Sequence, residues 1–349
     1  METNQPLMPL QESGPTLPRW VVTGGTGLVG EHLLHLMCSE QEPAQIVASY
    51  RTESRIGSQG ILTPESQQSI EWMACDLLDW NQLQNLVEGA ETVFHCAALI
   101  SYDPQDRELL WKQNVVCTAR LVDACLAAGV RRLVYISSIA ALGPSRSGEP
   151  VHEDSPWNEK EASSYYGKTK FAAEMEVWRG QEEGLEVVVV NPSVILGPGA
   201  VIGGSNQLFR KVSEGLRFYT PGSLGTVDPR DVARACLLLH RRNLTGRRFL
   251  LNGANLTFLE LFREMADQMK VTAPPFCPPY FMARWGILLS QWLHRIQGTR
   301  NFLSAETVKA AYTLKTYDGS RILREVPDFG YTPWKVSVAD GIAAMKQRV

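Results

Sequence analysis

Tyr166 and Lys170 are four residues apart, a spacing that could support proton chemistry on a helix. Residues i and i+4 of a helix lie on one face, about one turn apart. A phenol with an ordinary pKa of about 10 is a poor acid–base group at neutral pH, but a nearby ammonium lowers that pKa. Ser138, the second of a serine pair after a strand-like run, could hydrogen-bond the same substrate oxygen. The three side chains predict proton transfer at an alcohol or carbonyl oxygen.

A glycine-rich segment, residues 21–30 (VVTGGTGLVG), follows one strand-like run and opens a helix-like run. Its first glycine permits a tight turn, the second lets the backbone approach a pyrophosphate, and the third lets helix pack on strand. Amide groups at the start of the helix would face the phosphates. The segment therefore predicts a dinucleotide site with contacts from Gly24, Thr26, Gly27, Leu28, Val29 and Gly30.

The end of the second strand-like run predicts which dinucleotide is bound. An NAD site usually has an acid there to hold the ribose 2′-hydroxyl, whereas NADP needs a cation for its 2′-phosphate. This chain has Arg51, with Arg55 close behind, and residues 46–50 contain no acid. The guanidinium fork suits a phosphate. We expect NADP (NADPH), with NAD less favoured; a solvated surface arginine is the alternative reading of Arg51.

An alternation of strands and helices must position these groups. Strand-like apolar runs occupy residues 20–23, 46–50, 71–74, 92–95, 132–136 and 185–190. Helix-like stretches lie between most of them, at residues 30–38, 80–87, 113–128 and 166–183. Such alternation predicts an α/β fold with a parallel sheet covered on both faces.

The rhythm changes after Asn191-Pro192, where Gly/Pro-rich loops, a short strand near residues 248–251 and helices follow. We expect a flexible leader at residues 1–17 and a dinucleotide-binding domain at residues 18–191. Residues 192–349 are expected to form a smaller, mostly helical substrate-binding lobe, with segments that return to the first domain.

Composition excludes several classes of protein. The 349 residues are 44% hydrophobic and carry a formal net charge of −3, which excludes general disorder and gives no overall field for nucleic acid. The seven cysteines include no CxxC pair, which favours a reducing, cytoplasmic compartment. No HExxH motif indicates a metal, and we expect none. No signal peptide and no apolar run of about 18 residues is found, so no membrane span is expected.

Residues 280–296 (YFMARWGILLSQWLHRI) place their large apolar side chains at helical spacing. A helix packed on its own lobe is the leading interpretation. A substrate lid and contact with a membrane surface are the alternatives.

Together, these motifs resemble the extended branch of the short-chain dehydrogenase/reductase family, the NAD-dependent epimerase/dehydratase type, over residues 19–349. The resemblance implies a Rossmann-type doubly wound parallel sheet. It also implies that Ser138, set by its distance from Gly143, acts with Tyr166 and Lys170, and that Asn114 helps to seat the lysine. Further cofactor contacts implied by the resemblance come from Asp76 and Leu77 near the adenine, from Cys96, Ala97 and Ala98, and from Pro192, Ser193 and Val194 near the carboxamide.

The branch contains reductases, sugar epimerases and dehydratases, and departures from their patterns narrow the reaction. Dehydratases have Thr-Asp-Glu where this chain has Ser138-Ile139-Ala140, and nucleotide-sugar epimerases have an arginine where it has Leu224. What remains resembles the dihydroflavonol-reductase and 3β-hydroxysteroid-dehydrogenase-like group.

The resulting hypothesis is an NADP-dependent oxidoreductase that reversibly reduces an apolar ketone or aldehyde. A nucleotide-sugar epimerase with tightly bound NAD and a non-catalytic NADPH-sensing module are the alternatives. The resemblance also makes a homodimer possible.

Overall fold

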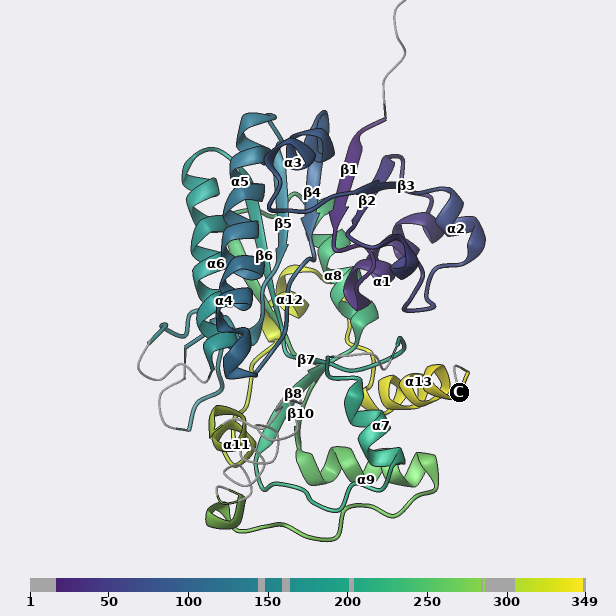
Figure 1. Ribbon diagram of the computed structural model, residues 1–349, viewed down its shortest axis with the longest axis vertical. Helices are drawn as coiled ribbons and strands as arrows, with labels where there is room; N and C mark the ends of the chain where they lie inside the picture. The colour runs from purple at the N-terminus through teal and green to yellow at the C-terminus, as the bar shows by residue number, and fades with distance from the viewer. Residues whose placement is uncertain are drawn as a thin grey trace, which may run out of the picture.

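The larger of two sheets has seven parallel strands and forms the upper part of the molecule (Figure 1). The computed structural model describes residues 17–143, 148–158, 164–200, 204–283, 285 and 305–347. The strand order is β3-β2-β1-β4-β5-β6-β9, which confirms the expected Rossmann-type fold. The strands are β1 (Arg19–Thr23), β2 (Gln45–Tyr50), β3 (Glu71–Ala74), β4 (Ala90–His95), β5 (Arg132–Ile136), β6 (Glu186–Pro192) and β9 (Arg247–Leu251).

Both faces of this sheet are buried, and the sequence of β6 shows why. Its four consecutive valines, Val187 to Val190, are fully buried. Val188 and Val190 pack in the hydrophobic core on one face, while Val187 and Val189 pack in the core on the other. A strand covered on both sides reads as a continuous apolar run without alternation, which is why these strands were visible in the sequence.

Helices cover the two faces as separate layers (Figure 1). One layer contains α3 (Trp80–Val87), α5 (Cys117–Ala127) and α6 (Tyr165–Glu182). The other contains α1 (Leu28–Ser39), α8 (Pro229–Arg241) and α12 (Ser320–Glu325). Because α8, α12 and β9 all follow residue 192 in the chain, the C-terminal half contributes to the larger sheet and one of its layers.

The lower part of the molecule is built on a second sheet of three strands, in the order β10-β8-β7. These are β7 (Val194–Ile195), β8 (Ser223–Val227) and β10 (Ala254–Thr257). Helices α7 (Gln207–Ser213), α9 (Phe258–Met269) and α13 (Trp334–Lys346) pack with this sheet around a third core. We did not expect this sheet, because strands of two to five residues are too short to show a periodic pattern. Helix α11 (Ala305–Ala311) lies in the same part.

The helix expected at residues 113–128 begins earlier and is not uniform. It starts as α4 (Arg107–Leu110), continues as a π-helical segment at Trp111–Val116 and then becomes α5. π-Helical turns inside longer helices are frequent at functional sites, and this one contains Asn114. Shorter elements are α2 (Pro64–Gln68) and the 3₁₀ turns η1 (Glu53–Arg55), η2 (Pro104–Asp106) and η4 (Ile139–Ala141). The leader, apart from Leu17, and most of the segment 280–296 lie outside the described residues.

Candidate active site

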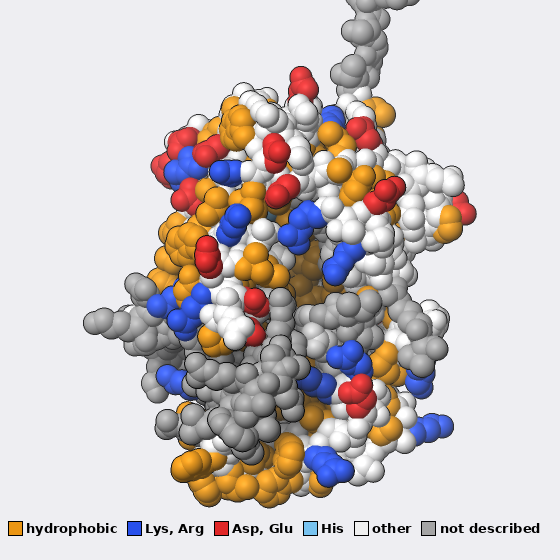
Figure 2. All heavy atoms as spheres, viewed as in Figure 1, with side chains coloured by type: hydrophobic (Ala, Val, Ile, Leu, Met, Phe, Trp, Pro, Cys, Tyr) orange, Lys and Arg blue, Asp and Glu red, His pale blue; other side chains and the backbone are white. Residues whose placement is uncertain are grey.

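The candidate site lies at the carboxyl ends of the parallel strands, where the two parts of the molecule meet. Ligands of open α/β sheets bind beyond these strand ends. Figure 2 shows the surface hollowed in this region, with hydrophobic side chains inside the hollow and Lys or Arg side chains along its upper rim. The loops after β1, β4, β5 and β6 carry most of the residues singled out in the sequence.

The glycine segment forms the turn between β1 and α1 and is closely packed. Gly24 has a φ of +69°, and a Cβ there would lie 2.6 Å from the amide nitrogen of Ala97. A Cβ on Gly30 would lie 2.2 Å from the carbonyl oxygen of Gly24. Helix α1 begins after Gly27 without a side-chain cap, which leaves amides of its first turn for an anion. Thr26, Leu28 and Val29 are half-buried along the same turn.

The loop after β2 carries the two predicted phosphate-binding cations. Arg51 and Arg55 are exposed, and Arg51 Nη1 donates a hydrogen bond of 2.9 Å to Oε1 of Gln113. The loop itself is tied to α1, because the buried carboxylate of Glu31 accepts hydrogen bonds from the amides of Gln59 (3.0 Å) and Ile61 (3.4 Å).

The loop after β3 contains the residues expected near the adenine. Asp76 is exposed, and its Oδ1 accepts a hydrogen bond of 3.0 Å from the amide of Leu78. Leu77 is buried in the core between the sheet and its neighbouring helices. These contacts fix the conformation of the loop at the edge of the sheet, next to the loop that carries Arg51.

Ser138 and Tyr166 meet beyond the end of β5. Ser138 caps the turn η4, its Oγ accepting a hydrogen bond of 3.1 Å from the amide of Ala140. A Cβ on Gly167 would lie 2.6 Å from the carbonyl oxygen of Ala140, so glycine allows the start of α6 to approach this turn. Burial raises the pKa of Tyr166 well above its ordinary value, Tyr102 adds to this, and a hydrogen bond with Ser138 lowers it.

Lys170 lies one turn along α6 from Tyr166 and is 1% exposed. Its Nζ donates a hydrogen bond of 2.9 Å to the carbonyl oxygen of Ile136 and lies 4.6 Å from the centre of the Tyr135 ring. Burial lowers the pKa of Lys170 to about 7, while Glu174 and Cys96 oppose this shift. The structure thus places Tyr166 and Lys170 on the first turns of one helix, with Ser138 beside Tyr166.

Asn114 contacts Thr169, the residue that precedes Lys170 in the sequence. Its Oδ1 accepts from the amide of Leu99 (2.8 Å), and its Nδ2 donates to the carbonyl of Leu99 (3.0 Å) and to Oγ1 of Thr169 (3.0 Å). These bonds hold the loop after β4 against α6. Any effect of Asn114 on Lys170 through its side chain therefore passes through Thr169 or through this loop.

A buried histidine supports the site from within the sheet. His95 Nδ1 lies 2.7 Å from Oγ1 of Thr23, and its Nε2 lies 3.0 Å from Oγ1 of Thr118. Burial, with a smaller effect of Lys170, lowers the pKa of His95 to about 3, so the ring is neutral at physiological pH. The loop that follows contains the three residues implied as cofactor contacts. Burial raises the pKa of the Cys96 thiol to about 12, Ala97 lies against Gly24, and Ala98 is exposed.

Pro192, Ser193 and Val194 connect the two sheets. Pro192 ends β6, the amide of Ser193 donates a hydrogen bond of 2.9 Å to the carbonyl of Leu251, and Val194 opens β7. Ser193 Oγ is buried and has no hydrogen-bond partner among the described residues.

Two apolar residues stand where this sequence departs from the epimerase and dehydratase patterns, and both lie in apolar surroundings. Leu224 is buried in the core of the second sheet. Ile139 and Tyr317 pack against a small apolar cluster that contains Leu142. The ring of Tyr102 lies edge-on to Tyr166, with the ring centres 5.9 Å apart.

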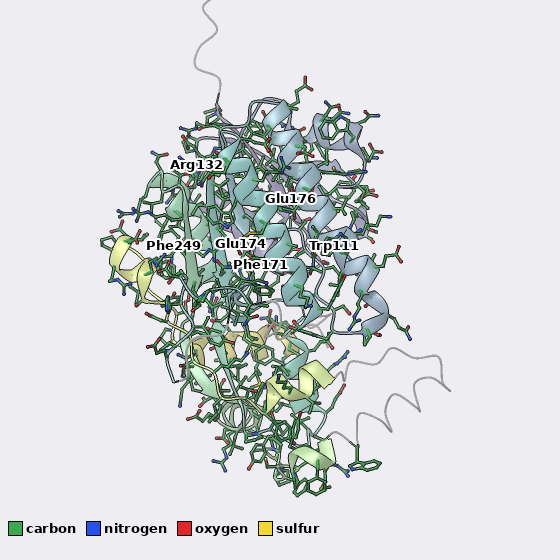
Figure 3. All side chains as sticks on the ribbon, turned by 90° about the vertical axis from the view of Figure 1, so that its left-hand side faces the viewer. Trp111, Arg132, Phe171, Glu174, Glu176 and Phe249 are labelled. Atoms are coloured by element: carbon green, nitrogen blue, oxygen red, sulfur yellow. The ribbon has the colours of Figure 1, made fainter. Side chains whose placement is uncertain are left out.

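Glu174 was not identified from the sequence, although it continues the four-residue spacing of Tyr166 and Lys170. Figure 3 labels it on α6, and its carboxylate pairs with Arg248 of β9 at 2.7 Å. The described residues contain no group of three or more His, Cys, Asp or Glu side chains arranged to bind a metal. Within the same residues, no helix has both the length and the apolar character needed to cross a bilayer.

Curated relatives cover nearly the whole chain. A putative dihydroflavonol 4-reductase of Synechocystis sp. is 28% identical over 87% of this chain and 88% of its own length. Sterol demethylase protein B of Methylococcus capsulatus is 28% identical over 94% of this chain and 98% of its own length. Their coverage extends the similarity into the C-terminal half.

Solved structures share the fold. The crystal structure of gox2253 aligns with a TM-score of 0.79 and 28% identity, over 94% of this chain and 98% of that one. A nucleoside-diphosphate-sugar epimerase of Pseudomonas aeruginosa aligns with a TM-score of 0.74 at 21% identity, over 95% and 98% of the two chains, and shows the fold alone.

The family model described as the NAD dependent epimerase/dehydratase family matches residues 20–251, which include the glycine turn and the Ser-Tyr-Lys group. The description of this family names NAD as its cofactor, and two of the solved structures that share the fold, at 22% and 21% identity, are complexes with NAD. This chain therefore belongs to the NAD-dependent epimerase/dehydratase family, within the extended short-chain dehydrogenase/reductases, and it is an NAD(P)-dependent enzyme of the oxidoreductase type.

Proposed function

We propose that this enzyme uses NADPH to reduce an apolar ketone or aldehyde to the alcohol, and that it catalyses the reverse oxidation. The observation that carries the proposal is the meeting of Ser138 and Tyr166 beyond β5, with Lys170 one turn along α6. The segment Ser138-Ile139-Ala140 supplies no carboxylate for the loss of water. Relatives named as reductases support the same reaction class.

The turn between β1 and α1 fits a dinucleotide. A Cβ at Gly24 or Gly30 would collide with neighbouring backbone, and the uncapped start of α1 offers amides to a pyrophosphate. When bound, the nicotinamide ring supplies the hydride for reduction. Lys170 would hold the nicotinamide ribose. Arg51 supports the choice of NADP, because the 2′-phosphate needs a cation at the end of β2.

The protein's own groups handle the proton and the substrate oxygen. A raised pKa keeps Tyr166 protonated at neutral pH, which is the form needed to give a proton to the oxygen as the carbonyl carbon gains hydride. Ser138 donates a hydrogen bond to the same oxygen. The Lys170 ammonium stabilises the phenolate that remains after transfer. In the reverse direction the phenolate accepts the proton.

The surroundings of Ser138 support an apolar substrate. Ile139 and Tyr317 pack against a hydrophobic cluster that contains Leu142, and the ring of Tyr102 lies edge-on to Tyr166. Aromatic and aliphatic side chains of this kind favour a substrate with a hydrophobic body next to its carbonyl. The buried Leu224 offers no cation to a sugar-nucleotide diphosphate, which disfavours the epimerase alternative.

The test is a panel of aromatic, steroid-like and small aliphatic ketones and aldehydes, with NADPH oxidation as the readout. Consumption of NADPH with at least one apolar carbonyl is expected, and Tyr166→Phe should slow it by at least about 10²-fold. The nucleotide released on denaturing the purified protein is measured in parallel. Stoichiometric NAD that survives dialysis, with no turnover on the panel, would overturn the proposal in favour of an epimerase.

A further inference from the structure

A completely buried carboxylate lies one helical turn behind Lys170 and has no part in the proposed proton transfer. Glu174 is 0% exposed. It accepts hydrogen bonds from Ser137 Oγ (2.7 Å), Asn191 Nδ2 (3.0 Å) and Trp178 Nε1 (3.3 Å), and it pairs with Arg248 Nη2 at 2.7 Å. A buried ion is unfavourable unless it is paired and hydrogen-bonded, and here four donors satisfy it.

These contacts join α6 to the strand end that carries Ser138. Ser137 precedes Ser138 directly, and Asn191 Nδ2 also donates to the carbonyl of Ser138 at 3.1 Å. Lys170 adds a further link between α6 and this strand end, because its Nζ donates a hydrogen bond to the carbonyl of Ile136. Residues 136–138 are therefore held to the same helix that carries Tyr166 and Lys170. Figure 3 shows this part of α6 beside β9, which is labelled at Phe249.

The charge of Glu174 also acts on Lys170. The groups around the lysine are His95 and Cys96 from the end of β4, Tyr135 from β5 and Tyr166 from its own helix. Burial is the largest influence on the pKa of Lys170 and lowers it, which favours the neutral amine. Glu174 and, to a smaller extent, Cys96 raise this pKa and favour the ammonium. Arg248 bears on Lys170 through its ion pair with Glu174.

We propose that Glu174, paired with Arg248, is a positioning residue: it fixes the strand end of Ser138 against the helix of Tyr166 and Lys170, and its negative charge favours the ammonium form of Lys170. Its catalytic consequence rests on the proposed function. Its effect on Lys170 does not, because that effect can be measured in the folded protein without any substrate.

The first experiment titrates Lys170 directly. Full-length protein carrying [ε-¹³C]lysine is followed by NMR between pH 5.5 and 9.5, and the Lys170 signal is assigned by its loss in Lys170→Arg. Glu174→Gln should lower the Lys170 pKa by about one unit, because a nearby opposite charge is removed. Arg248→Gln should shift that pKa upward. A residue with a purely structural role would not give shifts of opposite sign.

Two further variants serve as controls, one for the loss of a carboxylate from α6 and one for a failure of Glu174→Gln to fold. Glu176→Gln removes a carboxylate from the same helix, where it pairs with Arg179 at the surface, and should leave the Lys170 pKa unchanged. If Glu174→Gln alone does not fold, the double variant Glu174→Gln/Arg248→Gln removes both charges, and Arg248→Gln still gives the upward shift. Unchanged pKa values, or shifts of one sign in both single variants, would overturn the proposal.

The second experiment is the pH profile of NADPH-dependent turnover. In Glu174→Gln the high-pH loss of kcat should begin about one unit lower than in wild type, because the ammonium is lost earlier. Glu174→Asp keeps the charge, so it should lower kcat without moving that limb. If the pKa of Lys170 shifts as expected but no protein reduces a carbonyl compound, the proposed function alone is contradicted. If carbonyl reduction is normal but the pKa of Lys170 does not change, this inference alone is contradicted.

Discussion

Two regions of the predicted site are built in different ways. One is the catalytic wall, formed by Ser138 and by residues 166–174 of α6. The other is the end of the cofactor site that is predicted to hold the ribose phosphate. At the wall, Lys170 and Glu174 are almost completely buried: Lys170 donates a hydrogen bond to the carbonyl of Ile136, and Glu174 accepts three hydrogen bonds. At the ribose end, Arg51 and Arg55 are exposed, and a hydrogen bond to Gln113 orients Arg51. Burial strengthens electrostatic effects, whereas water and salt screen them. The wall should therefore control whether the reaction occurs, and the ribose end should control only which cofactor is preferred.

The largest expected effect is at the wall. Tyr166→Phe removes the proton donor and keeps the ring, so kcat for carbonyl reduction should fall by roughly 10²- to 10⁴-fold. NADPH affinity, measured by fluorescence titration, should stay within a few-fold of wild type. Turnover equal to wild type would show that another group transfers the proton.

Buried histidines should make the region around the wall sensitive to acid. Burial lowers the pKa of His95 to about 3, and those of His32 and His240 to about 4. An unfolded histidine has a pKa of about 6.5, so below that pH the unfolded state binds more protons and the folded state loses stability. The free energy of unfolding should fall by about 2 kcal/mol per histidine from pH 7 to pH 5.

Urea unfolding at the two pH values measures this loss. His95→Gln should reduce the pH dependence, because one buried titrating group is removed. His152→Gln, at a position that is 43% exposed, removes a histidine outside the buried set and is the matched control. An identical dependence in wild type and His95→Gln would contradict the interpretation of His95 as a neutral buried group.

The ribose end should give a smaller effect that concerns cofactor choice. Arg51→Asp should weaken NADPH binding about tenfold and leave NADH binding unchanged or improved, since an exposed charge-assisted contact lies at the lower end of its usual range. Titration of both cofactors into each protein measures the change. Arg210→Asp, at an exposed position on α7, controls for net charge. A mutant with the wild-type preference would remove Arg51 from the cofactor assignment.

The smallest effect is expected at Arg55, which is exposed on η1 one turn beyond Arg51. Arg55→Gln should weaken NADPH binding only about two- to threefold, and the loss should shrink further in 0.5 M salt. The same titrations report it. A loss larger than that of Arg51→Asp would make Arg55 the principal phosphate contact.

Local signals in the sequence predicted the parts of the site that depend on local geometry. The glycine turn and the Tyr166–Lys170 spacing each lie within one strand–turn–helix unit or one helix, so short patterns predicted them. The Glu174–Arg248 pair joins residues far apart in sequence, and it forms because β9 pairs with β6. The π-helical segment that places Asn114 depends on packing against α6 and had no sequence signal. Contacts of this kind depend on strand order and helix packing, which motif spacing does not specify.

The most direct test of the central claim follows a single hydride. The enzyme is incubated with NADPH that carries deuterium at both C4 positions of the nicotinamide and with an apolar carbonyl compound from the panel, and the product is analysed by mass spectrometry. The account predicts an alcohol with one deuterium on the former carbonyl carbon for wild type, formed roughly 10²- to 10⁴-fold more slowly by Tyr166→Phe. Unlabelled product, or a labelled alcohol formed equally fast by Tyr166→Phe, would contradict it.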